Sequence, residues 1–135
     1  MKNTDAAYLA GIIDGEGTIT LTRMHRNENR RPVISIASTD IELLIYIKDL
    51  VGGSISKKKN YCPSKHKLSY SLVVKRKEIV LSTLNDIRAY LKVPSKIKRA
   101  KYILENYEKV TPRNGKYNSS QLLMKQKFEK EFFTL

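Results

Sequence analysis

The apolar positions of this chain change period along its length, and each change predicts a boundary between a helix and a strand. In chain order, the predicted elements are a helix over 4–16, a hairpin of strands 17–26 and 31–38, a helix over 40–51, a second hairpin of strands 54–59 and 67–75, and helices over 78–91, 95–110 and 119–133. This order predicts an α+β fold with an αββαββα core. The alternation within the strands indicates one antiparallel sheet with an apolar face and a polar, basic face.

Polar residues before the first two helices are of the types that cap helices. Thr4 or Asp5 can cap the first helix, and Ser38 or Thr39 the second. Glycines follow both helices, and the second helix stops at Gly52-Gly53. With 135 residues, the chain is expected to form a single domain, with a core over about 5–110 and a C-terminal helix over about 118–135.

The charge of the chain indicates its partner. Lys and Arg number 26 against 13 Asp and Glu, which gives a net charge of +13 and a pI near 9.9. Such an excess is typical of proteins that bind a polyanion, and nucleic acid is the expected one. No apolar run approaches the roughly 18 residues of a membrane-spanning helix, and the first residues do not form a signal peptide. We therefore expect an intracellular protein without a membrane partner.

Metal chemistry, if present, must use carboxylates. The single cysteine, Cys62, excludes an internal disulfide and a cysteine-cluster zinc site, and His25 and His66 lack the spacing of metal ligands. Two carboxylates, Asp14 and Glu16, lie where the first helix runs out into a glycine-rich turn. Oxygen ligands of this kind suit magnesium.

The same segment carries a stripe of small residues. Ala7, Gly11 and Gly15 recur every four residues, so a second helix can approach the first one closely. The predicted interface consists of Ala7, Tyr8, Gly11, Ile12 and Gly15.

Residues 9–17, Leu-Ala-Gly-Ile-Ile-Asp-Gly-Glu-Gly, resemble the signature of the LAGLIDADG homing endonucleases, with six of nine positions identical. The order of predicted elements over roughly 5–105 is also that of a LAGLIDADG half-enzyme. The resemblance implies a curved four-stranded antiparallel sheet with helices on its back and its front in the DNA major groove. It also implies an intron-encoded nuclease that acts as a homodimer with Mg²⁺, in the cytoplasm of a prokaryote or in an organelle.

Three catalytic residues are implied by the resemblance. Glu16 takes the second acidic position of the motif and is the expected metal ligand together with the adjacent Gly15, supplied once by each subunit. Lys96 matches a family lysine that points toward the metals and the scissile phosphate. Ser38 stands where the family usually has Gln or Asn to organise water, and its role can also have moved to Thr39 or be that of a helix cap. Asp14 is expected to be structural, with a compensating cation near the helix end.

The polar face of the sheet supplies the candidates for DNA contacts. Hydroxyl, lysine and arginine side chains suit base edges and phosphates. The candidates on the face opposite the predicted core are Thr20, Thr22, Met24, Arg31, Val33, Ser35, Ser56, Lys58, Ser69 and Ser71.

Three functions are compatible with these patterns. The first is a homodimeric homing endonuclease that cuts both strands of a long, pseudo-palindromic DNA site. The second is an intron maturase or a non-cleaving nucleic-acid-binding protein on the same fold, for which Ser38 and Glu42 leave room because both depart from the family pattern. The third, a basic α+β protein such as a ribosomal component, fits the composition but not the motif.

Overall fold

The computed structural model describes residues 1–58, 64 and 67–135. The predicted loop residues Cys62 and Pro63, and also His66, lie outside the described residues. The elements are α1 (Asn3–Glu16), β1 (Gly17–Thr22), β2 (Arg31–Ser38), α2 (Ile41–Val51), β3 (Ser54–Lys57), β4 (Tyr70–Val74), α3 (Lys77–Ile87), η1 (Arg88–Tyr90), α4 (Pro94–Asn106), η2 (Glu108–Val110) and α5 (Ser119–Phe132). The predicted αββαββα order and the α+β class are confirmed.

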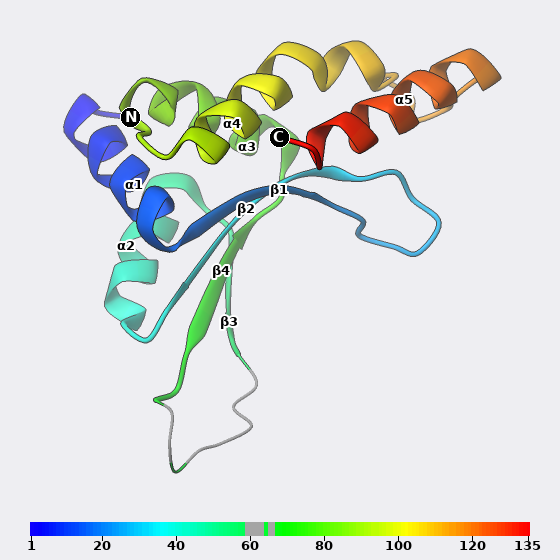
Figure 1. Ribbon diagram of the computed structural model, residues 1–135. Helices are drawn as coiled ribbons and strands as arrows, with labels where there is room; N and C mark the ends of the chain where they lie inside the picture. Colours follow the sequence, from blue (N-terminus) through cyan, green and yellow to red (C-terminus); the bar gives the residue numbers. More distant parts are fainter. Residues whose placement is uncertain (59–63, 65–66) are drawn as a thin grey trace.

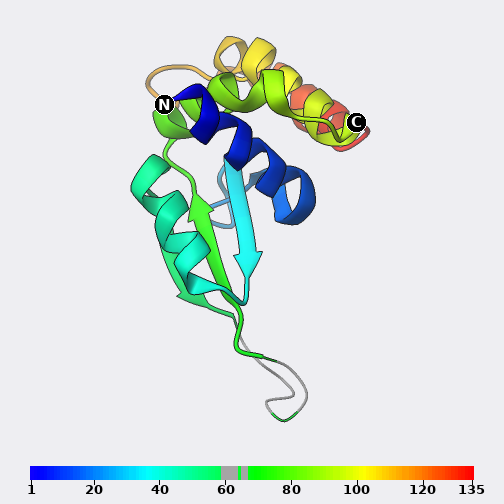
Figure 2. The same ribbon diagram turned by 90° about the vertical axis from the view of Figure 1, so that its left-hand side faces the viewer.

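The four strands form one antiparallel sheet in the order β1-β2-β4-β3. Figure 1 shows α1, α3, α4 and α5 on one side of the curved sheet, with α2 beside β3 and β4. Viewed from the side, α1 crosses the strands while α2 runs beside them (Figure 2). Among the described residues, no helix covers the opposite face (Figure 1). No helix of the described chain combines the length and the apolar character needed to cross a membrane.

The register of the strands explains the two faces. Ile19 pairs with Ile34, and Ile36 pairs with Leu72, so these side chains share one face and lie buried under the helices. Each neighbouring residue along a strand points to the other face. The predicted core positions Ile19, Leu21, Ile34, Ile36, Leu72 and Val74 are buried, while Ile55 and Tyr70 are half-buried at the margin of the core.

Several predicted boundaries were wrong. β1 ends at Thr22 instead of continuing to residue 26, because Thr22–Arg31 is the last pair of the hairpin. Helix α1 begins at Asn3 with Lys2 as N-cap, so neither Thr4 nor Asp5 is the cap. Asp5 instead accepts a hydrogen bond of 2.8 Å from the Tyr46 hydroxyl.

The cap of the second helix also differs from the prediction. The N-cap of α2 is Asp40, and the Ser38 hydroxyl oxygen accepts the Asp40 N–H at 3.0 Å in the turn before the helix. Helix α5 begins with a capping box, in which Asn118 and Gln121 each accept the other's backbone N–H. The last turns of the predicted helices 78–91 and 95–110 are the separate 3₁₀ segments η1 and η2.

Candidate functional site

Glu16 is the last residue of α1 and lies exposed at the point where the chain turns into β1. Gly17 makes this turn possible, because a Cβ at this position would lie 2.7 Å from the Ile13 Cα atom. Among the described residues, no lysine, arginine or histidine lies within ion-pair distance of Glu16. The carboxylate is therefore available to a cation from outside the chain.

Asp14, two residues earlier, is fully engaged by the backbone. Its Oδ2 accepts the Lys92 N–H at 2.8 Å, and its Oδ1 accepts the Val93 N–H at 3.1 Å. Both amides lie just before α4, whose first residue, Pro94, has no N–H to offer. Asp14 thus ties the end of α1 to the start of α4, and its predicted structural role is confirmed.

Lys96 supplies the cation expected near the end of α1. Its Nζ donates to the carbonyl oxygens of Ile13 at 2.5 Å and of Asp14 at 2.6 Å. These carbonyls carry the negative end of the helix dipole, so the ammonium is stabilising there. Two of the three Nζ–H groups are occupied by α1, and the expected direction of Lys96 toward the metals and the scissile phosphate stays a prediction. Lys96 nevertheless lies at the same helix end as Glu16.

Ser38 is largely buried. The residue is 9% exposed, and its Oγ accepts the Asp40 N–H. The pairing of Gly17 with Ile36 places Ser38 at the same end of the sheet as Glu16. Its expected role in organising water stays a prediction, and Thr39 beside it, the alternative for that role, is exposed.

The open face of the sheet holds most of the residues predicted to contact DNA. Thr20 pairs with Val33 and Thr22 with Arg31 on the first hairpin, and Ser56 pairs with Ser71 on the second. Backbone pairing continues beyond these strands, because the Lys58 N–H donates to the Ser69 carbonyl oxygen at 2.8 Å. The hydroxyl and basic residues at these positions therefore share the open face of the sheet.

Two of the predicted contacts do not fit this surface. Val33 pairs with Thr20 on the open face but is only 4% exposed. Met24 lies two residues beyond the end of β1, so the period of the strand no longer fixes its direction. The remaining predicted contacts on the open face are Thr20, Thr22, Arg31, Ser35, Ser56, Lys58, Ser69 and Ser71.

The small-residue stripe of α1 is open. Ala7, Gly11 and Gly15 are exposed, and a Cβ added at either glycine would have no atom within 4 Å. Tyr8 is 53% exposed, although its ring meets the Tyr46 ring edge-on at 5.5 Å. Ile12 is half-buried beside the core. Another helix can therefore approach this stripe, which runs to the same helix end as Glu16.

The described part of one chain does not complete a metal site. It contains no group of three or more His, Cys, Asp or Glu residues that could hold an ion. Glu16 and the backbone oxygen of Gly15 remain the predicted donors from this chain. Further oxygen ligands would have to come from a second copy, from a nucleic acid or from water.

Sequence reasoning missed two arginines that hold the outer edge of β1. Arg99 on α4 donates to the Ile19 carbonyl oxygen at 2.9 Å, and its guanidinium lies 4.9 Å from the centre of the Phe132 ring. Arg30 makes a similar bond to Leu21. Both contacts join residues of separate elements, so they leave little signal in the sequence. The signal that was present is that Arg30 lies an even number of positions before the buried Ile34, and a strand places such residues on the same face.

Comparison with known proteins agrees with this geometry. The sequence model of the family described as LAGLIDADG endonuclease matches residues 9–88. The intron-encoded DNA endonuclease ai2b of Dictyostelium discoideum is 29% identical over 104 residues, which cover 77% of this chain. The matched part spans 39% of the length of that relative.

Solved structures have the same fold. The homing endonuclease I-CvuI, in complex with its target in the presence of 2 mM Ca, superposes with a TM-score of 0.75 at 20% identity, over 98% of this chain and 82% of that one. An archaeal intron-encoded homing endonuclease complexed with DNA gives a TM-score of 0.65 at 19% identity, over 99% of this chain and 85% of that one. The predicted curved four-stranded sheet with helices on its back is thereby confirmed.

Proposed function

Because this chain belongs to the LAGLIDADG endonuclease family, we propose that it is a homing endonuclease that hydrolyses both strands of a long, pseudo-palindromic DNA site as a homodimer. The observation that carries the proposal is the exposed Glu16 at the end of a helix with an open small-residue stripe. A binding protein gains nothing from an unpaired carboxylate directed at phosphates. A nuclease uses it to hold a cation beside the scissile bond.

A divalent cation, Mg²⁺ in our proposal, would be held by Glu16 and Gly15 of each subunit. Such a cation would supply stabilisation of the negative charge that develops on the phosphate and on the leaving oxygen. The donor set fits, because carboxylate and carbonyl oxygens are the ligands that magnesium prefers. Asp14 and Lys96 act on the protein side of the site by fixing the end of α1, which sets the position of Glu16. The third Nζ–H of Lys96 remains for a phosphate or a water molecule.

Cleavage of both DNA strands by this chemistry needs two copies of the chain. Residues 9–17 form the one copy of the motif in the sequence, and two strands must be cut. Packing of two α1 stripes against each other would place the two Glu16 carboxylates side by side. Two such like charges oppose each other's ionisation, and a divalent cation held by both would offset this, which supports a shared metal site.

The open face of the sheet is the proposed DNA surface. A two-stranded ribbon fits the major groove, and the hydroxyl and basic side chains on this face can donate to bases and phosphates. With +13 per chain, the dimer would carry about twice that charge, so binding should weaken steeply as salt is added. The intron-encoded relative supports an intron origin, and with it a location in an organelle or a prokaryote.

The decisive experiment is selection of cleaved sites from a randomised DNA library with Mg²⁺, followed by cleavage of the selected site by variants. Glu16→Gln should abolish cleavage while binding in Ca²⁺ persists. Glu105→Gln removes the same charge from an exposed position of α4 and should cleave as the wild type does. Absence of any cleaved site, or full activity of Glu16→Gln, would reject the nuclease assignment.

A second function, an intron maturase or a non-cleaving binder, is favoured by Ser38. Serine stands where the family usually has Gln or Asn, and its Oγ already accepts the Asp40 N–H in the turn. This alternative requires that the protein bind DNA or its own intron RNA without cutting. Binding of the intron RNA with splicing assistance, together with intact DNA under all metal conditions, would establish it.

A further inference from the structure

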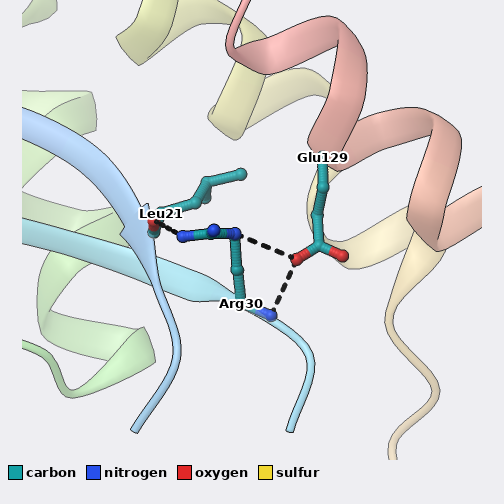
Figure 3. Close-up of polar contacts among 3 residues, drawn as sticks. All are labelled: Leu21, Arg30 and Glu129. Atoms are coloured by element: carbon teal, nitrogen blue, oxygen red, sulfur yellow. Dashed lines mark hydrogen bonds and ion pairs between the residues drawn. The ribbon is translucent and has the colours of Figure 1, made fainter. Parts of the chain in front are cut away.

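Arg30, directly before the second strand of the first hairpin, is bonded to Glu129 on helix α5 (Figure 3). The Arg30 N–H donates to Glu129 Oε1 at 2.9 Å, and Arg30 Nε lies 3.8 Å from the same oxygen. The Glu129 side chain is 12% exposed and that of Arg30 is 31% exposed. A carboxylate that accepts a backbone N–H with little solvent around it holds that amide more firmly than an exposed ion pair would.

The Arg30 side chain also holds the strand opposite. Its NH1 donates to the Leu21 carbonyl oxygen at 3.2 Å (Figure 3). Leu21 pairs with Pro32, which has no N–H to offer, so this carbonyl is not used by β2 and faces the free edge of β1. Arg30 therefore links β1, the start of β2 and α5 at one point, with its guanidinium 4.9 Å from the centre of the Phe133 ring.

This point is the root of the loop 23–29. The last pair of the hairpin is Thr22–Arg31, and beyond it the described loop has a backbone bond from Glu28 N–H to the His25 carbonyl oxygen at 3.1 Å. Arg23 and Arg26 are exposed on this loop. The direction in which the loop leaves the sheet is therefore set where Glu129 fixes the Arg30 amide.

The loop would meet DNA far from the cut. β1 has six residues and begins next to Glu16, so its far end lies about 20 Å from the proposed active site at the usual rise of a strand. With about 3.4 Å per base pair, this distance corresponds to about six base pairs. A tilt of the loop at its root would move Arg23 and Arg26 away from their contacts without moving Glu16.

We propose that Arg30 and Glu129 are positioning residues through which α5 sets base specificity at the outer base pairs of each half-site. The proposal rests on the proposed function, since it needs a bound DNA site. It assigns α5 a role in recognition although the helix lies on the side of the sheet away from the proposed DNA surface (Figure 1).

The test compares base preference at every position of the selected site for four variants. Arg26→Ala first identifies the positions that the loop reads. Glu129→Ala should lower discrimination at those same positions by about fivefold or more and leave the inner positions unchanged. Glu129→Gln, which keeps an oxygen for the Arg30 N–H, should retain most of the preference. Glu131→Ala is the matched control, because Glu131 lies on the same helix but accepts from the Tyr102 hydroxyl instead.

Amide hydrogen exchange of the DNA-free protein gives a second readout. Glu129→Ala should speed exchange of the Arg30 amide by about tenfold or more, whereas Glu131→Ala should not. An unchanged preference profile in a folded Glu129→Ala protein, or an equal loss at all positions, would overturn the proposal, as would unchanged exchange of the Arg30 amide. If the wild type selects no DNA site, the proposed function fails, and the positioning role of Glu129 in DNA recognition fails with it.

Discussion

Lys96 places its Nζ 2.6 Å from the carbonyl oxygen of Asp14, while the Asp14 carboxylate accepts two backbone N–H groups from the residues just before Lys96's helix. The two residues thus connect α1 and α4 twice, once through an acceptor on α1 and once through a donor on α4. Helix α1 gives a carboxylate to the start of α4, and α4 gives an ammonium to the end of α1. Glu16 follows directly after this double attachment, so its position depends on both residues.

Replacement of Lys96 by Met should lower both stability and activity. The variant loses two hydrogen bonds from a charged donor and the favourable charge at the end of α1, so the free energy of unfolding should fall by about 1–3 kcal/mol. Urea unfolding of the DNA-free protein measures this effect. Lys98→Met, at an exposed position of the same helix, should change stability little. A Lys96→Met protein as stable as the wild type but inactive would indicate a purely catalytic lysine.

Replacement of Asp14 by Asn should weaken the same attachment from the other side. One carboxylate oxygen becomes an NH₂ group that faces the N–H of Lys92 or Val93, and a loss of about 1–3 kcal/mol is expected. Cleavage should fall with it, because the end of α1 is released. Asp49→Asn, an exposed position of α2, serves as the control for the charge change in thermal unfolding. Equal stabilities of the two variants would refute the structural role of Asp14.

The fold was predictable because its signals are local. Residues of one strand alternate with a period of two, so the assignment of Ile34 and Ile36 to the core also fixed which hydroxyls face outward. The end of β1 was not predictable in this way. Alternation continues past Thr22 in the sequence, but the strand ends where its pairing with β2 ends, and pairing depends on the partner.

The site was predictable only as far as the motif reached. The motif placed Glu16 at the end of a helix and Asp14 in a structural role. The two hydrogen bonds from Lys96 reach Asp14 and Ile13, which lie 82 and 83 positions earlier in the sequence. No local pattern encodes such contacts. Val33 is buried although the alternation of its strand assigns it to the polar face, whereas Ser38 has the strand parity of the buried Ile34 and Ile36.

A bulky residue in place of Gly11 should prevent dimerisation and leave folding intact. A Cβ at this position meets no atom within 4 Å in the single chain, so Gly11→Leu should fold and should gain helix propensity of up to about 1 kcal/mol. In the proposed dimer the added side chain would hold the two α1 helices apart. Analytical ultracentrifugation should then show monomers, with double-strand cleavage lost. Asn85→Leu, an exposed position of α3, is the matched control, and a dimeric, active Gly11→Leu protein would exclude this interface.

Lys125 should make the folded protein more stable as the pH rises above about 8. Its side chain is fully buried, its Nζ donates to the Thr111 hydroxyl at 2.6 Å, and it lies 4.1 Å from the centre of the Tyr107 ring. Burial lowers the pKa of Lys125 to about 8, partly opposed by the charge of Glu129. The folded protein therefore releases this proton at lower pH than the unfolded chain, whose lysine has its ordinary pKa of 10.5.

The sign of the effect follows from proton binding. Between the two pKa values the unfolded chain binds more protons, so stability rises with pH, by about 2 kcal/mol from pH 8 to about pH 9.5. Burial raises the pKa of the adjacent Tyr107 and Tyr117, so both stay protonated over this range. Lys125→Met should match or exceed the wild-type stability at pH 7 and should lack the rise. Urea unfolding at a series of pH values measures both curves, and parallel curves would show that Lys125 keeps its proton in the folded protein.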